Sequence, residues 1–227
     1  MKKIISIMML MIISLSVYAN DIYINQSGAT LDLDVLQDGQ NNTIGSSGTA
    51  SSVIGATTNL AITQIGDSNV MTFDVNGATY TGTFSVTGNT NNIDFNCDSG
   101  GNNSSCGTAT ASIVWVGSSN DIDIDIGETS SATSATVGIT GASGSDSNVV
   151  LGTIDGNSAI LTLSINGDTN NFLVDIDGNG DSVGHTYVHT HTGSIADVDI
   201  TQSGIYDNMI TLTTSGDNAD IDIIQRD

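Results

Sequence analysis

Three histidines are the residues of this sequence whose type and spacing come closest to a catalytic or metal-binding pattern. His185, His189 and His191 fall on one side of an extended segment, and a His-x-His pair can bind a transition metal through neutral imidazoles. They are the only histidines of the chain, no cysteine is near them in the sequence, and the spacing fixes no fourth ligand. We therefore expect a strand or loop that faces solvent, and we name no metal ligand.

A short acidic motif could bind calcium. Asp175, Asp177, Asn179 and Gly180 have the spacing with which a calcium loop begins, because alternate oxygens can face one ion and glycine permits the sharp bend. The position where such a loop carries a bidentate glutamate holds Thr186, so the ligand set is incomplete. An ion site and a strand end followed by a turn both stay open, and the missing ligand favours the second. We expect no cofactor.

The two cysteines predict a disulfide. Cys97 and Cys106 flank a segment of Asp, Gly, Asn and Ser residues, which is typical of a loop. In an exported chain an isolated pair around such a loop indicates a bond that pins it. The closed loop is short, so the bond should add only about 2–3 kcal/mol of stability.

Catalysis finds no support elsewhere in the sequence. Carboxylates are so numerous that the proximity of two aspartates carries no information. The repeats described below contain no Lys or Arg that could hold an anionic substrate or stabilise a developing negative charge. We do not expect an enzyme.

The start of the chain predicts export. Lys2 and Lys3 precede an apolar stretch over residues 4–17, and the small residues Val17 and Ala19 stand two places apart before Asn20. This is the pattern of a cleaved signal peptide. We expect a signal peptide at 1–19, a single domain at 20–227, and a secreted, extracellular or cell-surface location.

The charge of the mature chain excludes several partners. Of the three cations only Arg226 follows residue 19, so the 25 acidic residues leave a net charge of −24 with histidine neutral. Nucleic acid and anionic lipid are bound through Lys and Arg contacts to phosphate, which this chain lacks. We expect no nucleic-acid binding and, since no later stretch is long and apolar enough, no membrane span.

A turn motif recurs along the chain. In each copy Gly is followed three residues later by Asn, with small or polar turn formers between them. The copies are Gly39 to Asn42, Gly66 to Asn69, Gly88 to Asn91, Gly117 to Asn120, and Gly167 to Asn170.

Alternating apolar residues flank these turns in a shared register. They are Ile62, Phe84, Ile113 and Leu163 before the turns, and Met71, Phe73, Val75, Ile93, Phe95, Ile122, Ile124, Ile126, Phe172, Val174 and Ile176 after them. Each unit is thus strand, tight turn, strand, with one apolar face that it cannot bury alone. Stacked units can bury it, and the chain contains no Pro to interrupt a strand ladder. The sequence predicts an all-β fold, a β-solenoid of roughly six to eight coils with strands about 4.8 Å apart.

Aspartates fill many positions between the apolar residues and should face solvent. They are Asp32, Asp34, Asp121, Asp123, Asp125, Asp197, Asp199, Asp220 and Asp222. The units are unequal in length, with 22 residues from Gly66 to Gly88 and 29 from Gly88 to Gly117, which follows from their numbering. We therefore expect loops of variable length between some coils.

The turn motif resembles the repeat of the curlin family, in which Gln-x-Gly-x-x-Asn precedes the second strand. Two units carry the whole pattern, at Gln37, Gly39 and Asn42 and at Gln64, Gly66 and Asn69. Gln26 with Gly28, and Gln202 with Gly204 and Asn208, are near matches. Elsewhere the Gln position is apolar, which predicts a stack held by an apolar core.

The resemblance implies a structural role. It implies a subunit or nucleator of extracellular amyloid-type fibres, curli-like pili of a biofilm matrix that serve cell adhesion. The implied partners are other copies of the chain or a related fibre subunit, and an outer-membrane secretion machinery. A solenoid without end caps has two open edges that can template the next chain.

The alternative is a monomeric or surface-attached β-solenoid that acts as an adhesin or an ice-binding module. Thr79, Thr81 and Thr83, with Thr211 and Thr213, would be its surface. Because a threonine pattern on every unit is not visible in the sequence, we expect no regular array, and we favour the fibre subunit.

Overall fold

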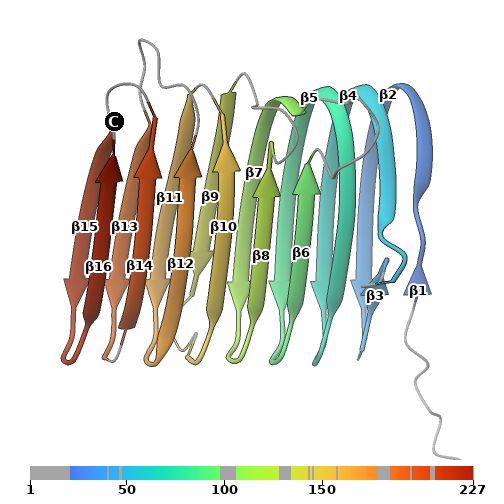
Figure 1. The fold of residues 1–227 in the computed structure, drawn as a ribbon. Coiled ribbons are helices and arrows are strands. Elements are labelled where there is room, and N and C mark those ends of the chain that lie inside the picture. Colours follow the sequence, from blue (N-terminus) through green and yellow to red (C-terminus); the bar gives the residue numbers. More distant parts are fainter. Residues whose placement is uncertain are drawn as a thin grey trace, which may run out of the picture.

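The chain forms a parallel β-solenoid of about seven turns (Figure 1). The computed structural model describes residues 21–39, 41–45, 48–97, 106–127, 134–142, 144, 146–156, 158–177, 185–194, 196–204 and 208–226. Over these residues every element is a strand, and every strand pair is parallel. The predicted all-β solenoid is confirmed. No helix in the described part is long and apolar enough to cross a membrane.

Each turn of the solenoid contributes one strand to each of two faces. The threonine face contains the second halves of β2 (Asn25–Asp38), β4 (Ser51–Ile65) and β5 (Val70–Thr87), followed by β7 (Cys106–Val116), β9 (Ser134–Gly141), β11 (Ala159–Asn166), β13 (Thr186–Thr192) and β15 (Met209–Ser215). The aspartate face contains β1 (Asp21–Ile22), β3 (Thr43–Ile44), the first parts of β2, β4 and β5, and then β6 (Asn92–Cys97), β8 (Asp121–Ile126), β10 (Val149–Asp155), β12 (Asn170–Asp177), β14 (Ala196–Ser203) and β16 (Asp220–Arg226).

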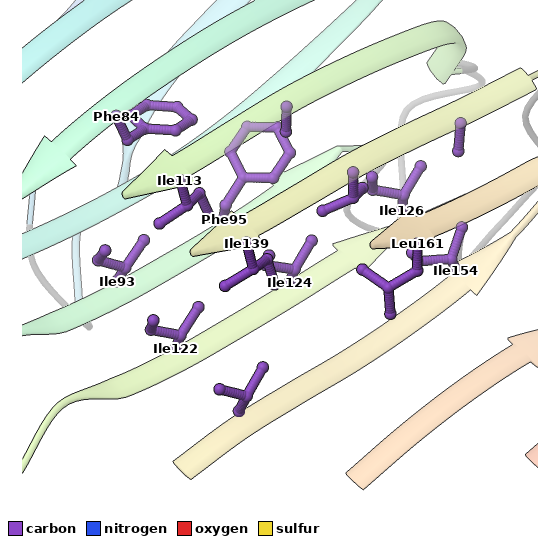
Figure 2. Close-up of a cluster of buried hydrophobic side chains, with 14 of the residues drawn as sticks. Phe84, Ile93, Phe95, Ile113, Ile122, Ile124, Ile126, Ile139, Ile154 and Leu161 are labelled. Carbon is purple, nitrogen blue, oxygen red and sulfur yellow. The ribbon is translucent and has the colours of Figure 1, made fainter. Parts of the chain in front are cut away.

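The core lies between the two faces and is built from stacked columns of apolar side chains (Figure 2). Residues alternate between core and solvent because successive side chains of a strand point to opposite sides. In β8 the three isoleucines are buried and the three aspartates face outward, as predicted. Parallel pairing in register then places buried residues of successive turns directly beside one another. One buried column is Ile93, Ile122, Val150, Phe172 and Val198.

The widest side chains fill the middle turns of the core. Trp115 is fully buried, and its register partner on the next turn is Gly141. A Cβ on Gly141 would come within 2.7 Å of the Trp115 ring, so the indole occupies space that only glycine leaves open. Phe95 stacks on Tyr80 with ring centroids 5.0 Å apart. Close packing of this kind makes the interior dry and specific in shape.

Tight turns gather along one edge of the solenoid, the lower edge in Figure 1. Gly88 begins one of them with a φ of 150°, and its N–H donates to the carbonyl oxygen of Val116 at 2.9 Å. A Cβ at this position would overlap the carbonyl oxygen of Gly66 in the turn below. The residue two places later, Thr90, has a φ of 61°. Glycine is therefore required here both by backbone conformation and by the close stacking of successive turns.

Replacing Gly88 by alanine is expected to lower the free energy of unfolding by about 2 kcal/mol, because the change adds backbone strain and a steric overlap. Gly138, in the middle of β9, is a matched control, since an added Cβ there meets nothing within 4 Å. Chemical unfolding of both variants checks this. Equal stability of the two alanine variants would contradict it.

The connections at the opposite edge differ in length. They include residues 98–105, 128–133 and 178–184, which lie outside the described residues. The strands on either side of each connection keep the same parallel register. The unequal spacing of the glycines therefore arises mainly at this edge, while the turn edge is regular except for the longer connection at 142–148.

Candidate functional site

A ladder of buried asparagine side chains runs along the turn edge. Asn69, Asn91, Asn120, Asn148 and Asn170 are each at most 2% exposed. The Nδ2 atom of each donates to the Oδ1 atom of the next, at 2.9, 2.7, 2.9 and 3.0 Å. Each Oδ1 also accepts from the backbone N–H of the preceding asparagine. The asparagine of the motif is thus a link between successive turns.

The same side chains close their own turns. Asn69, Asn91, Asn120 and Asn170 each donate through Nδ2 to the carbonyl oxygen of the glycine three residues earlier, at 2.6–3.0 Å. Asn91, Asn120 and Asn170 in this way use both the donors and the acceptor of a buried amide, which fixes the register between turns. Oδ1 of Asn69, at the start of the ladder, has no hydrogen-bond partner among the described residues. The turn residues predicted at Gly66, Gly88, Gly117 and Gly167 therefore belong to one continuous structure.

Asn148 is the member of the ladder that the Gly-x-x-Asn pattern missed. Its turn contains Gly144 four residues earlier instead of three, so the spacing differs by one. The tripeptide Asp146-Ser147-Asn148 repeats Asp67-Ser68-Asn69, and this repetition was the available signal. Ser147 has a φ of 58°, like the equivalent residue of the other turns.

The ladder ends differently at its two extremities. Asn42 is buried but donates to the carbonyl oxygens of Gly39 and Ile65, at 3.4 and 3.1 Å, and forms no side-chain link to Asn69. Beyond Asn170 the next position holds the ring of His191, whose Nε2 lies 2.9 Å from the carbonyl oxygen of Gly167. The amide ladder therefore occupies the middle of the solenoid.

Glutamine pairs occur at the two ends of the solenoid. Gln64 donates through Nε2 to Oε1 of Gln37 at 2.8 Å, and both side chains are buried. At the other end Gln225 donates to Oε1 of Gln202 at 3.1 Å. Between them the inward columns are mainly apolar, as the sequence predicted, with the buried histidines of the later turns as an exception. The two bonds have the same polarity, because the glutamine of the later turn is the donor in each.

The second glutamine pair lies at a different edge from the first. Gln37 and Gln64 precede tight turns, whereas Gln202 ends β14 and is followed by Gly204 at the edge that carries the variable connections. Gly204 and Asn208 thus do not form a turn of the Gly-x-x-Asn kind. The sequence motif is similar at the two edges because an inward glutamine is the last residue but one of the strand in each case, in β2 and β4 on one face and in β14 on the other.

The structure joins Cys97 to Cys106. The disulfide links the end of β6 to the start of β7, with the two Cα atoms 5.6 Å apart and both sulfurs in the core. Residues 98–105, which it encloses, lie outside the described residues. The bond lies within the longest interval between successive turn glycines in the middle of the chain, the 29 residues from Gly88 to Gly117.

The expectation that the histidines face solvent is wrong. His185, His189 and His191 are each at most 1% exposed. The last two lie on the inner side of β13, where the register places them in line with Leu163 and Ile165 of the preceding turn. Polar rings at core positions were not visible in the sequence because the exposed threonines between them make the segment look polar throughout.

The histidines contact one another and aromatic residues. The His189 ring lies edge-on to Phe172 with centroids 4.6 Å apart, and its Nδ1 is 2.8 Å from the hydroxyl of Tyr187. Burial, with a smaller contribution from His191, lowers the pKa of His189 to about 4. Burial also raises the pKa of Tyr187. His189 is therefore neutral at pH 7.

The acidic motif is only partly within the described residues. Asp175 and Asp177 both face outward from β12, while Asn179 and Gly180 lie outside the described residues. Asp177 accepts a hydrogen bond from the hydroxyl of Ser203 at 2.8 Å. Burial, and then the neighbouring Asp177, raises the pKa of Asp175. Over the described part of the chain no three His, Cys, Asp or Glu side chains are grouped so that they could hold a metal ion.

Negative charge is concentrated on the aspartate face. Its outward positions include Asp74, Asp94, Asp121, Asp123, Asp125, Asp155, Asp175, Asp177, Asp197, Asp199, Asp220 and Asp222. Asp94 and Asp123 are register partners on adjacent turns. Partial burial raises the pKa of Asp94, and the charges of Asp123, Asp74 and Asp121 raise it further. The aspartates predicted to face solvent do so.

The threonine face carries no Asp, Glu, Lys or Arg from the second half of β4 through β15. Its outward rows are rich in Thr and Ser, and residues such as Asn59, Val114, Gly138 and Ile160 interrupt them, so the threonines do not repeat on every turn. The threonines are Thr57, Thr63, Thr79, Thr81, Thr83, Thr87, Thr108, Thr110, Thr136, Thr140, Thr162, Thr186, Thr190, Thr192, Thr211 and Thr213. This enrichment on one face was hidden in the sequence because the variable connections shift its members relative to one another.

Both ends of the solenoid are open over the described residues. At the C-terminal end β15 and β16 pair only with β13 and β14. Ile221 and Ile223 of β16 point along the core columns and are 37% and 45% exposed. At the N-terminal end Leu31, Leu33 and Val35 of β2 are half-buried. Each end thus exposes unpaired strand edges and a cross-section of the apolar core.

Together these features define a two-faced, open-ended parallel β-solenoid, with one acidic face and one face that is uncharged from β4 to β15 and carries Asp32, Asp34 and Asp38 on β2. Comparisons of the chain with protein-family models, with curated proteins and with solved structures give no match.

Proposed function

We propose that this protein is a secreted, curlin-like structural protein, a subunit or nucleator of extracellular amyloid-type fibres in a biofilm matrix and in cell adhesion. Fibres grow when the C-terminal end of one copy stacks on the N-terminal end of the next. The observation that carries the proposal is the pair of open ends, each with free strand edges and exposed core residues. Free edges of this kind add further strands through backbone hydrogen bonds.

The register of the glutamines supports head-to-tail stacking. Gln26, near the start of β2, lies in the same inward column as Gln202 and Gln225, through a continuous series of paired residues. If the next copy continues this column, its Gln26 follows Gln225. The Nε2 atom of Gln26 would then donate to Oε1 of Gln225, with the polarity seen inside the solenoid. A ladder that continues across the junction would fix the register between copies.

Export supports the extracellular part of the proposal. The signal-peptide pattern at 1–19 directs the chain to compartments in which the Cys97–Cys106 bond can form. The acidic surface would keep single copies apart at low ionic strength, so that growth is favoured where salt screens the charge.

The test is fibre growth by residues 20–227, followed by thioflavin fluorescence and electron microscopy. Ile223→Lys places a charge on the exposed core cross-section, and Ile224→Lys places the same charge on the adjacent outward position. The two isoleucines are 45% and 43% exposed, so the variants are closely matched. We expect Ile223→Lys to slow growth at least tenfold, because the ammonium would be buried at the junction.

Ile224→Lys should grow at a rate close to that of the wild type, since its side chain stays in solvent. Similar growth of the two variants, or persistent monomers of the wild type in salt, would contradict end-to-end assembly. The folded state of each variant is checked by its β-sheet circular dichroism.

A further inference from the structure

The threonine face is a second surface that end-to-end stacking leaves uncovered. From β4 to β15 it presents seven parallel strands, and none of its outward residues carries a charge. The opposite face has aspartates on most of its strands. A chain with a net charge of −24 after residue 19 thus keeps seven of the eight strands of this side free of charge, and the outward charges of the eighth strand, β2, are Asp32, Asp34 and Asp38 at the N-terminal end.

The side chains of this face fit some partners poorly. Between β4 and β15 a charged ligand would find no counter-charge. The aromatic residues of these strands, Tyr80, Phe84, Trp115 and Tyr187, are all buried, so a sugar ring finds no exposed aromatic ring to pack against. What the face offers is β-branched and small uncharged side chains, together with the exposed aliphatic groups of Val114, Val116 and Met209. Such side chains interdigitate in the dry interfaces between paired sheets.

The area is sufficient for a stable pair of copies. Strands about 4.8 Å apart that rise about 3.3 Å per residue give this face roughly 800 Å². Two copies in contact would bury on the order of 1,600 Å² in total, which is the size of an ordinary specific interface.

The distribution of charge also favours contact through this side. Face-to-face pairing leaves the two aspartate faces on the outside, separated by the thickness of both solenoids. Sheets pack about 10 Å apart, so this separation is roughly 30 Å, several times the Debye length at physiological salt. Contact through the aspartate faces would instead bring like charges together.

The centre of the face carries a residue without a side chain. β9 is the middle one of the seven strands, and Gly138 lies outward at its midpoint between Thr136 and Thr140. An added Cβ on Gly138 meets nothing within 4 Å. A two-fold pair places the centre of one face on the centre of the other, where a glycine lets the two sheets approach closely.

We propose that two copies of this chain pair through their threonine faces, with Gly138 near the two-fold axis. In a fibre the same contact joins two stacks side by side. The inference is independent of end-to-end stacking, because it uses a different surface.

The test is the mass of residues 20–227 in 0.15 M salt, measured by sedimentation equilibrium in the Ile223→Lys background, which removes end-to-end growth under the proposal above. If growth persists in that background, the measurement is made on freshly prepared protein before fibres form. We expect a dimer at micromolar concentrations. Gly138→Arg should raise the dimer dissociation constant at least tenfold, because it puts charge and bulk at the centre of the face, where an added Cβ meets no other atom within 4 Å.

Thr153→Arg, on the middle strand of the aspartate face, is the matched control and should leave the dimer intact. Thr162→Arg on β11 is a second variant of the threonine face, and it should act like Gly138→Arg. A monomer at all concentrations up to about 100 μM would overturn the proposal. So would equal effects of Gly138→Arg and Thr153→Arg, or a monomer whose threonine face binds ice or a neutral glycan.

Discussion

Replacing Asn120 by alanine is expected to lower the free energy of unfolding by about 3–5 kcal/mol, although the change removes only one side-chain amide. Asn120 is at the centre of the ladder. Its Nδ2 donates to Gly117 and Asn148, and its Oδ1 accepts from both the side chain and the backbone N–H of Asn91.

The cost arises from the groups that stay behind. Alanine leaves the carbonyl oxygen of Gly117 and two donors of Asn91 without these partners in a site that excludes water. Each buried polar group that loses its partner costs roughly 1–3 kcal/mol. The shared bonds between neighbouring amides make the loss extend to the turns on both sides.

Asn89→Ala is the matched control, since Asn89 is exposed in the preceding turn and accepts one hydrogen bond from Ser118 at 3.2 Å. Its loss should cost less than about 1 kcal/mol. The urea midpoints of the two variants distinguish two explanations. Either the ladder holds successive turns together, or its amides only fill space at the turn edge. Equal midpoints would contradict the first alternative.

The sequence was sufficient for those features that repeat within each unit. The alternation of isoleucine and aspartate in residues 121–126 has one solution in a strand with a single buried side, and the structure adopts it. The Gly-x-x-Asn turns were visible because Gly and Asn are both required in the same short segment. These signals are local. They predict the solenoid even when it is not known which turns are neighbours.

Features that depend on the alignment of different turns could not be predicted in the same way. The threonine rows form only when residues such as Thr81 and Thr110 are brought side by side by connections of unequal length. For the same reason Gln202 was assigned to a tight turn, although it lies at the opposite edge. To predict these features, the residues of successive turns must be aligned with one another, and a search for one short motif does not give that alignment.

Mild acid is expected to destabilise the C-terminal turns through His189. The unfolded chain binds a proton at this residue with a pKa near 6.5, whereas burial lowers the pKa in the folded state to about 4. Between these values the unfolded state binds more protons, so stability decreases as the pH falls from about 6.5 to about 4. The full loss is about 3 kcal/mol, and it is complete below the folded-state pKa.

Among the described residues, the contacts of the ring offer no compensation for a positive charge. The groups with which His189 has ring or hydrogen-bond contacts are Phe172, Tyr187 and His191, and none of them is a carboxylate. The aspartates act in the opposite direction, because the raised pKa of Asp94 makes the folded state the better proton acceptor at that site. Acid therefore relieves repulsion on the aspartate face while it weakens the core at one end.

His189→Leu separates the two effects. Its register partners in the turns on either side are Leu163 and Leu212, so leucine fits the column, and the cost at neutral pH should be about 1 kcal/mol for the Tyr187 hydroxyl that loses its partner. Thermal or urea unfolding of wild type and variant is measured from pH 7 to pH 4. The variant should lose less stability on acidification, by about 3 kcal/mol, and should become the more stable of the two near pH 4. Parallel stability curves over this range would show that His189 does not carry the acid sensitivity.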